Sequence, residues 1–333
     1  MNLPGAPVPP GAHPVTQNLT RGPADVSWAA RLSLAQAPQS RPPGMEDGMA
    51  TGVLPEDGPV QVGPVTLPAG RRQYSEDDDQ LVAWATEDPM PDAGRAWLAL
   101  SAAHAETGLV PVLLEPAPPA GEHGDPPYFG FYLPADVALM DRMSAETVLA
   151  RDWSGEFDDP GATAHRAPFG DRFPGLAPAE SERLPTAELQ QAVSALPPAH
   201  LGLVSACRPA DVPATVGWSV FGVDFCDWDE PPDSPAQLEG FLAGARSLQI
   251  GVVLRSWETR FGARLLRIGG DAILQVLVER PPRTLELARR VAAEQYAFAD
   301  EVRQGAGFES VGDTVASIAA SLIGAPVWQF WWD

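Results

Sequence analysis

The chain has 333 residues, of which 44% are hydrophobic, so it is long enough to bury a sizeable core. Its Asp and Glu residues number 44 against 22 basic residues, and the formal net charge is -22 at pH 7. A field of this sign repels nucleic acids and anionic membranes, so neither is expected as a partner, whereas a basic protein is. The simpler explanation of the charge is that it keeps the protein in solution.

All basic residues are arginines, and the sequence contains no lysine. A phosphate-binding P-loop, a pyridoxal phosphate enzyme and a protein kinase each depend on a lysine, so all three classes are excluded. The sequence also lacks a Gly-x-Ser-x-Gly elbow and a His-Glu-x-x-His metal motif. We therefore expect no cofactor and assign no catalytic residue.

Cysteine usage and hydropathy indicate the compartment. Cys207 and Cys226 form neither a Cys-x-x-Cys pair nor a short-spaced metal set, and a disulfide framework is not expected. No run of 18 apolar residues is present, and the first residues do not resemble a secretory signal. We therefore expect a cytoplasmic protein that does not associate with membranes.

Residues 1–59 are predicted to be a disordered leader. The first 60 residues contain eleven prolines and seven glycines without a period, which is typical of disorder. Met45 and Met49 lie within this leader, and translation starting at one of them is an open alternative to Met1.

Residues 1–48 should be dispensable, because a segment of this composition buries too little apolar surface to fold. Limited proteolysis should leave a stable fragment that begins between residues 49 and 75. Protection of the leader from protease in the isolated protein would contradict this expectation.

Residues 60–185 are predicted to form an α/β module with long loops. Gln80–Thr86 and Leu109–Leu114 have the composition of strands, and Asp92 can cap a helix between them. This order with short links predicts a βαβ unit, and hence a parallel pair of strands. Pro111 favours an edge position for the second strand, because proline cannot donate a ladder hydrogen bond.

Residues 186–333 are predicted to form an α+β domain that begins with the strand His200–Ala206. A long helix is expected over about Pro235–Phe261 and should end at Gly262. One apolar stripe runs along its last turns, at Ile250, Val253, Leu254, Trp257 and Phe261.

The remaining elements follow closely along the chain. Arg264–Ile268 and Ala272–Glu279 flank Gly-Gly-Asp, a hairpin signature. Two helices, about Thr284–Phe298 and Ser310–Ile323, precede an aromatic strand over Val327–Trp332. The predicted class is therefore α+β, with a mixed sheet covered by helices.

Several segments carry a family resemblance. Leu254–Ala263 (LRSWETRFGA) and the terminal Val327–Asp333 (VWQFWWD) resemble the bacterial domain of unknown function 4253 (DUF4253), which would cover about residues 225–333. Ala167–Pro178 (APFGDRFPGLAP) and Pro209–Trp218 (PADVPATVGW) are similar to segments of its longer actinobacterial members. The resemblance implies a fold, but it implies no activity.

Trp257 is the residue that the resemblance singles out. It lies between Arg255, Glu258 and Arg260, which could form a charged rim beside an aromatic ligand platform. The favoured interpretation is that Trp257 packs in the core, because it lies on the apolar stripe, and that the three charged residues are solvated.

An acidic loop over residues 224–233 is the second candidate site. Its carboxylates could bind a divalent cation, but their spacing does not match an EF-hand, so no metal is expected. We interpret the segment as a solvated loop, and Asp227, Asp229 and Glu230 are its candidate contacts for a basic partner.

Cys207, followed by Arg208, is the candidate for thiol chemistry. His200, at the other end of the same strand, is about 20 Å away if the strand is extended, which is too far for a base. A buried structural cysteine is the favoured interpretation.

Two functions from different classes are therefore open. The favoured one is a non-enzymatic protein-interaction module with an acidic surface. The alternative is a small hydrolase or thiol enzyme that uses Cys207 or the acidic loop 224–233.

Overall fold

A computed structural model describes eight segments of the chain, residues 52–75, 79–115, 129–153, 162–218, 235–269, 273–299, 301–304 and 309–332. Their strands are β1 (Gly58–Val62), β2 (Val65–Tyr74), β3 (Leu81–Thr86), β4 (Leu109–Glu115), β5 (His200–Ser205), β6 (Ala263–Gly269), β7 (Ile273–Val278), β8 (Glu301–Gln304), β9 (Glu309–Ser310) and β10 (Val327–Trp331). The helices are α2 (Ala93–Ala102), α3 (His104–Thr107), η1 (Val137–Arg142), α4 (Ala145–Trp153), α5 (Ala162–His165), α6 (Thr186–Ser194), η2 (Pro209–Asp211), α7 (Val212–Val216), α8 (Pro235–Gly244), α9 (Arg246–Phe261), α10 (Leu285–Phe298) and α11 (Val315–Leu322), of which η1 and η2 are 3-10 helices.

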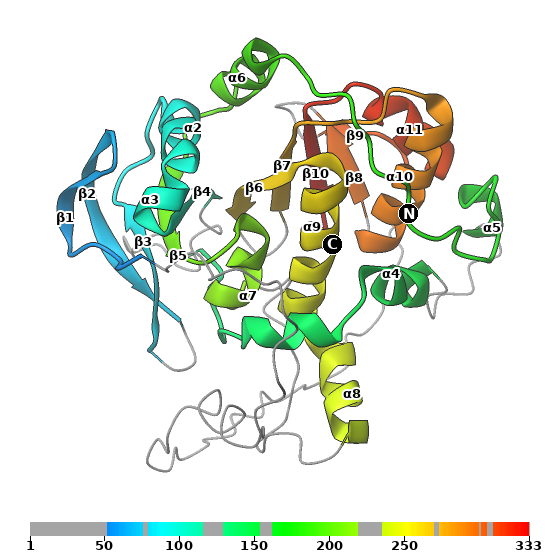
Figure 1. The fold of residues 1–333 in the computed structure, drawn as a ribbon, viewed down its shortest axis with the longest axis horizontal. Coiled ribbons are helices and arrows are strands. Elements are labelled where there is room, and N and C mark those ends of the chain that lie inside the picture. Colours follow the sequence, from blue (N-terminus) through cyan, green and yellow to red (C-terminus); the bar gives the residue numbers. More distant parts are fainter. Residues whose placement is uncertain are drawn as a thin grey trace, which may run out of the picture.

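The described strands form a mixed sheet of ten strands in the order β1-β2-β3-β5-β4-β6-β7-β10-β8-β9 (Figure 1). β4 and β6 are parallel neighbours, and the other neighbouring pairs in this order are antiparallel. Together with the helices, this sheet confirms the predicted α+β class. Among the helices of the described segments, none combines the length and the apolar character needed to cross a membrane.

Helices cover the sheet, and buried side chains form two clusters. The larger cluster joins α9 and α10 to strands β6, β7 and β10, and it contains Ile250, Val276 and Phe330. The smaller cluster contains Trp84 of β3 and Trp97 of α2. Burial of these large side chains is the main contribution to the stability of the fold.

The last residues of the predicted leader belong to the fold. Residues 1–51 lie outside the described residues, but the N–H of Gly52 donates to the carbonyl of Gly108 at 2.9 Å, and Leu54 is buried. The Ser205 hydroxyl also donates to the carbonyl of Gly52 at 2.6 Å. The predicted end of the leader at residue 59 was therefore wrong, because residues 52–59 already contact the sheet.

The two strands of the predicted βαβ unit are not neighbours in the sheet. β3 and β4 have the same direction, but β5 lies between them and pairs antiparallel with both. The predicted pairing of the two strands was therefore wrong, because a distant strand contributes the hydrogen bonds.

β4 is also an interior strand, although Pro111 had indicated an edge. Pro111 pairs with Leu203 on the β5 side, whereas the β6 side is paired only from Leu113 to Glu115. The proline is tolerated because β6 does not pair with residue 111, so no hydrogen bond from its backbone nitrogen to β6 is needed.

The division into an N-terminal module and a C-terminal domain at residues 185/186 stays a prediction. Strands from both sides of it pair within one sheet, since β5 contacts β3 and β4, and β4 contacts β6.

The helix expected over Pro235–Phe261 is two helices. The backbone turns at Ala245, where ψ is 80°, and α9 begins after it. The side-chain amide of Gln249 donates to the carbonyls of Leu242 and Ala243 at 2.9 and 2.8 Å, which satisfies the end of α8. A polar side chain of α9 thus replaces the backbone hydrogen bonds that a continuous helix would make.

The other local signals in this region are confirmed. α9 ends at Gly262, whose φ of 62° is in the left-handed region that glycine adopts without strain. α10 begins after Thr284, whose hydroxyl accepts a hydrogen bond from the N–H of Leu287. β6 and β7 form the predicted antiparallel hairpin.

Candidate functional site on helix α9

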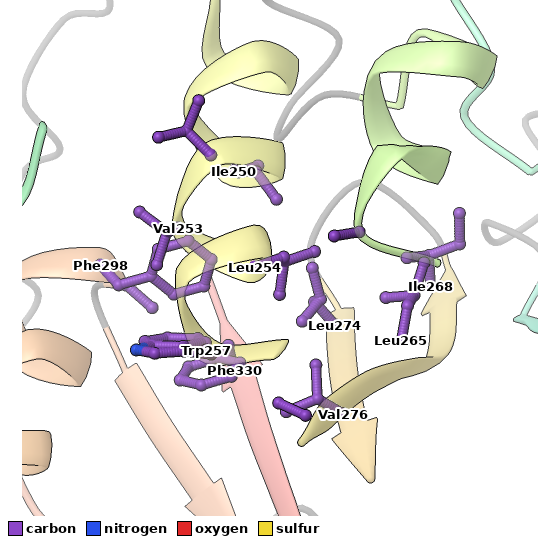
Figure 2. Packing of buried hydrophobic residues seen from close by; sticks show 14 of the residues in the cluster. Ile250, Val253, Leu254, Trp257, Leu265, Ile268, Leu274, Val276, Phe298 and Phe330 are labelled. Atoms are coloured by element: carbon purple, nitrogen blue, oxygen red, sulfur yellow. The ribbon is translucent and has the colours of Figure 1, made fainter. Parts of the chain in front are cut away.

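Trp257 lies at the centre of the larger core cluster and is fully buried. Its indole ring stacks on Phe330, with 5.3 Å between the ring centroids, and meets the edge of Phe298 at 4.9 Å (Figure 2). Ile250, Val253 and Leu254 of the apolar stripe belong to the same buried cluster (Figure 2). An exposed ligand platform at Trp257 is therefore not present in this structure, and the side chain packs as the core interpretation predicted.

Glu294 of α10 is the partner of Trp257, and sequence reasoning missed it. This carboxylate is fully buried, and it accepts hydrogen bonds from the Trp257 indole N–H at 2.7 Å and from the N–H of Ala177 at 2.6 Å. The Arg260 guanidinium donates to both carboxylate oxygens, each at 2.7 Å. The available signal was a glutamate directly after the apolar run Val291–Ala293 of the expected helix.

Arg260 completes this buried network. It also donates to the carbonyl of Ala177 at 2.9 Å and to the hydroxyl of Ser256 through Nε and Nη2. The ion pair with Glu294 is bidentate, and such a pair is favourable in a core only when its other hydrogen bonds are made, as they are here. Arg260 is therefore an internal residue rather than part of a solvated rim.

Arg255 joins α9 to two other elements. Its Nε donates to Asp211 at 2.7 Å, and its Nη1 donates to Asp141 at 2.9 Å. Asp211 is buried, whereas Asp141 is exposed, so the guanidinium spans the boundary between core and solvent. Arg255 thereby fixes η1 and η2 against α9.

The contacts of Arg255 and Arg260 connect the segments that carried the family resemblance. Ala177 belongs to Ala167–Pro178, and Asp211 belongs to Pro209–Trp218, while both arginines belong to Leu254–Ala263. The structure thus brings these three segments together: Arg260 bonds the backbone of Ala177, and Arg255 bonds the carboxylate of Asp211.

Glu258 is the charged residue of this helix whose environment disfavours its charge. Burial raises the pKa of its carboxyl, and the nearby Asp211 raises it further. Arg208, Arg255 and Arg264 oppose this effect but do not cancel it. The side chain is half-buried and close enough to Asp211 of η2 to interact with its charge.

Glu258→Gln should raise the free energy of unfolding at neutral pH, because the parent must ionise this carboxyl in a site that disfavours the charge. A raised pKa means that the folded protein binds more protons than the unfolded one between the two pKa values. The stability contribution of Glu258 therefore falls as the pH rises through that window. The advantage of the variant should vanish when the pH is lowered below the usual range of glutamate.

Urea denaturation at a series of pH values measures this effect, with Glu188→Gln on α6 as the exposed control. A variant no more stable than the parent at neutral pH would contradict the expectation.

Cys207 is exposed, so the interpretation as a buried structural cysteine was wrong. It lies in the bend between β5 and η2. His200 at the other end of β5 is buried, and its Nδ1 lies 2.8 Å from the carbonyl of Thr86. That histidine is committed to the backbone and is not a base for Cys207.

The acidic loop cannot be compared with the structure. Asp227, Asp229 and Glu230 lie outside the described residues, as does Cys226. In the part of the chain that the structure does describe, no group of three or more metal-ligating side chains could hold an ion.

Comparison with known proteins assigns the C-terminal part of the chain. Residues 236–333 match the family described as Domain of unknown function (DUF4253). The match contains Trp257, Arg260 and Glu294, whereas Ala177 and Asp211 precede it. No curated protein and no solved structure matches the chain.

Proposed function

We propose that this protein, which carries a DUF4253 domain over residues 236–333, is a non-enzymatic interaction module that binds a basic protein through its acidic surface. The observation that carries the proposal is the distribution of charge. The acidic residues outnumber the arginines two to one, so carboxylates remain in excess even if every arginine is paired.

The ion pairs of the described residues show how the arginines are used. Glu294 and Asp211 hold the guanidiniums of Arg260 and Arg255, and Glu279 lies within 3.2 Å of two others. Arginines in such pairs are Arg71, Arg72, Arg151, Arg183, Arg246, Arg255, Arg260, Arg264, Arg267 and Arg283. Because each of these arginines is already paired with a carboxylate, none is left to offset the unpaired acidic residues.

The excess of acid is spread over several elements. Asp88 and Asp92 before α2, Glu106 in α3, Glu146 in α4 and Glu188 in α6 are all exposed. A broad negative field accelerates the encounter with a basic protein and disfavours contact with nucleic acid.

The test begins with affinity capture from the host lysate and identification of the proteins that copurify. A captured basic protein is then purified, and its association rate is measured between about 50 and about 500 mM salt. The rate should fall steeply, because exposed charges are screened over about 10 Å or less. A partner whose association ignores salt would contradict the proposal.

Two triple variants locate the contact. Neutralising Asp227, Asp229 and Glu230 should weaken binding without lowering the melting temperature. The matched control removes the same charge elsewhere, through neutralisation of Asp88 and Glu188 together with Glu106. Equal weakening by both variants would assign the effect to the overall field rather than to the loop. If neither variant weakened binding, the proposal would be wrong, and the acidic residues would serve solubility alone.

A thiol enzyme centred on Cys207 is the second candidate. It is favoured by the exposure of Cys207 and by the cationic Arg208 beside it. The folded protein with Cys226→Ser should then react with an alkylating reagent faster than a free thiol does, and Cys207→Ser should abolish the reaction. Reaction at the rate of an ordinary exposed thiol would exclude this candidate.

We also propose that the protein acts in the cytoplasm. The support is that Cys207 is an exposed thiol, which a reducing compartment maintains. Fractionation of host cells should recover the protein with cytoplasmic markers, and recovery from the medium would contradict this.

A further inference from the structure

One row of polar side chains crosses the sheet inside an apolar environment. Arg267 of β6 is paired in register with Gln275 of β7, and Gln275 is paired with Gln329 of β10. Directly paired residues point to the same face of a sheet, so the three side chains form one polar row. Their exposed fractions are 2%, 4% and 3%, and Leu113 and Leu277 next to them are fully buried.

The row is only partly satisfied. The side-chain amide of Gln275 donates to the Gln329 amide oxygen. The Arg267 guanidinium donates to Glu115 at 3.2 Å and to the carbonyl of Pro197 at 3.5 Å, both long for a buried cation. Within the described part of the chain, three buried atoms of the row make no hydrogen bond, namely Arg267 Nε, Gln275 Oε1 and Gln329 Nε2.

Arg267 Nε and Gln275 Oε1 are complementary to each other but do not bond. One is a donor and the other an acceptor, and they belong to residues that are directly paired on neighbouring strands. Neither atom has a hydrogen-bond partner in the structure, so a third group that reaches both would satisfy them.

The chemistry of the row selects that group. It must accept from Arg267 Nε and donate to Gln275 Oε1. A carboxylate or phosphate accepts but cannot donate, and it would repel the amide oxygen. Water does both, and buried water typically makes two to four hydrogen bonds to polar groups that would otherwise be unsatisfied.

We propose that a buried water molecule bridges Arg267 Nε and Gln275 Oε1 and is an integral part of this polar row. The water completes the solvation of a cation that its long contact with Glu115 leaves undercompensated. Burial lowers the pKa of Arg267, which agrees with a guanidinium short of acceptors.

A crystal structure of the protein at atomic resolution is the direct test. The expected result is a water oxygen at about 2.7–3.2 Å from both Arg267 Nε and Gln275 Oε1. A direct hydrogen bond between the two side chains, or an apolar side chain filling the space, would overturn the proposal.

Nuclear magnetic resonance tests the same water in solution. In protein labelled at arginine, the Arg267 Nε–H should show a cross-peak to water, and Gln275→Leu should abolish it. Gln295→Leu is the matched control, because Gln295 is also buried and unbonded but lies on α10, outside the row. A cross-peak that persists in Gln275→Leu contradicts the bridge, and the parent spectrum alone decides the matter if that variant does not fold.

Discussion

Glu294→Leu should lower the free energy of unfolding by about 3–5 kcal/mol, the loss expected when one partner of a buried ion pair is removed. The carboxylate is fully buried and accepts from Trp257, Arg260 and the backbone of Ala177. Without it, the Arg260 guanidinium keeps its charge in a largely buried position with no counter-charge. Urea denaturation of parent and variant measures the difference.

Two controls separate the charge from the packing. Glu286→Leu alters an exposed glutamate in the first turn of the same helix and should change stability by less than about 0.5 kcal/mol. The double variant Arg260→Met, Glu294→Leu should be less destabilised than Glu294→Leu alone, because it leaves no uncompensated charge. A double variant as unstable as the sum of the two single variants would show that the ion pair is not the source of the effect.

Trp257→Ala should cost roughly 3–5 kcal/mol, because it leaves a large cavity among Phe298, Trp328 and Phe330. The ring is fully buried, so its loss cannot be offset by solvent. Thermal and urea denaturation both measure the change.

The substitution Trp257→Phe isolates one contact of this side chain. It keeps an aromatic ring against Phe330 but removes the N–H that Glu294 accepts, so its cost should be smaller than that of Trp257→Ala. If Trp257→Ala melted like the parent and yet lost the binding of a partner, the ligand-platform interpretation would be correct after all.

Local signals were sufficient for the helices and the hairpin around α9. The end of α9 at Gly262 and the start of α10 at Thr284 depend on residues within one turn of each boundary. The break at Ala245 was not predictable, because the side chain that caps α8 comes from Gln249, already inside the next helix.

The strands at the other side of the sheet escaped prediction for a different reason. β2 carries a proline, a glycine and two arginines and lacks the alternation of a half-buried strand. Its Gly70 lies under the Trp84 ring of β3, where an added Cβ would come within 2.2 Å of the indole. Such a strand is specified by the partner it packs on, which a local pattern does not reveal.

The residues that α9 contributes to the candidate site could be predicted from the sequence, but their partners could not. Arg255, Trp257, Glu258 and Arg260 were identified as a group, because their spacing was apparent on one helix. Their partners could not be identified, because Asp211 and Glu294 are distant in sequence and only the fold brings them to α9. The error about Cys207 has the same origin, since exposure after a strand depends on what packs there.

The order of the strands has a consequence for folding during translation. β4 pairs with β5 and β6, both synthesised long after it, and β10, the last strand of the chain, holds β8 to β7. The nascent sheet therefore has unpaired strand edges until β10 emerges, and such edges favour aggregation. Of the described strands, β10 is the last to be synthesised, so the native link between β7 and β8 forms only after β10 has emerged.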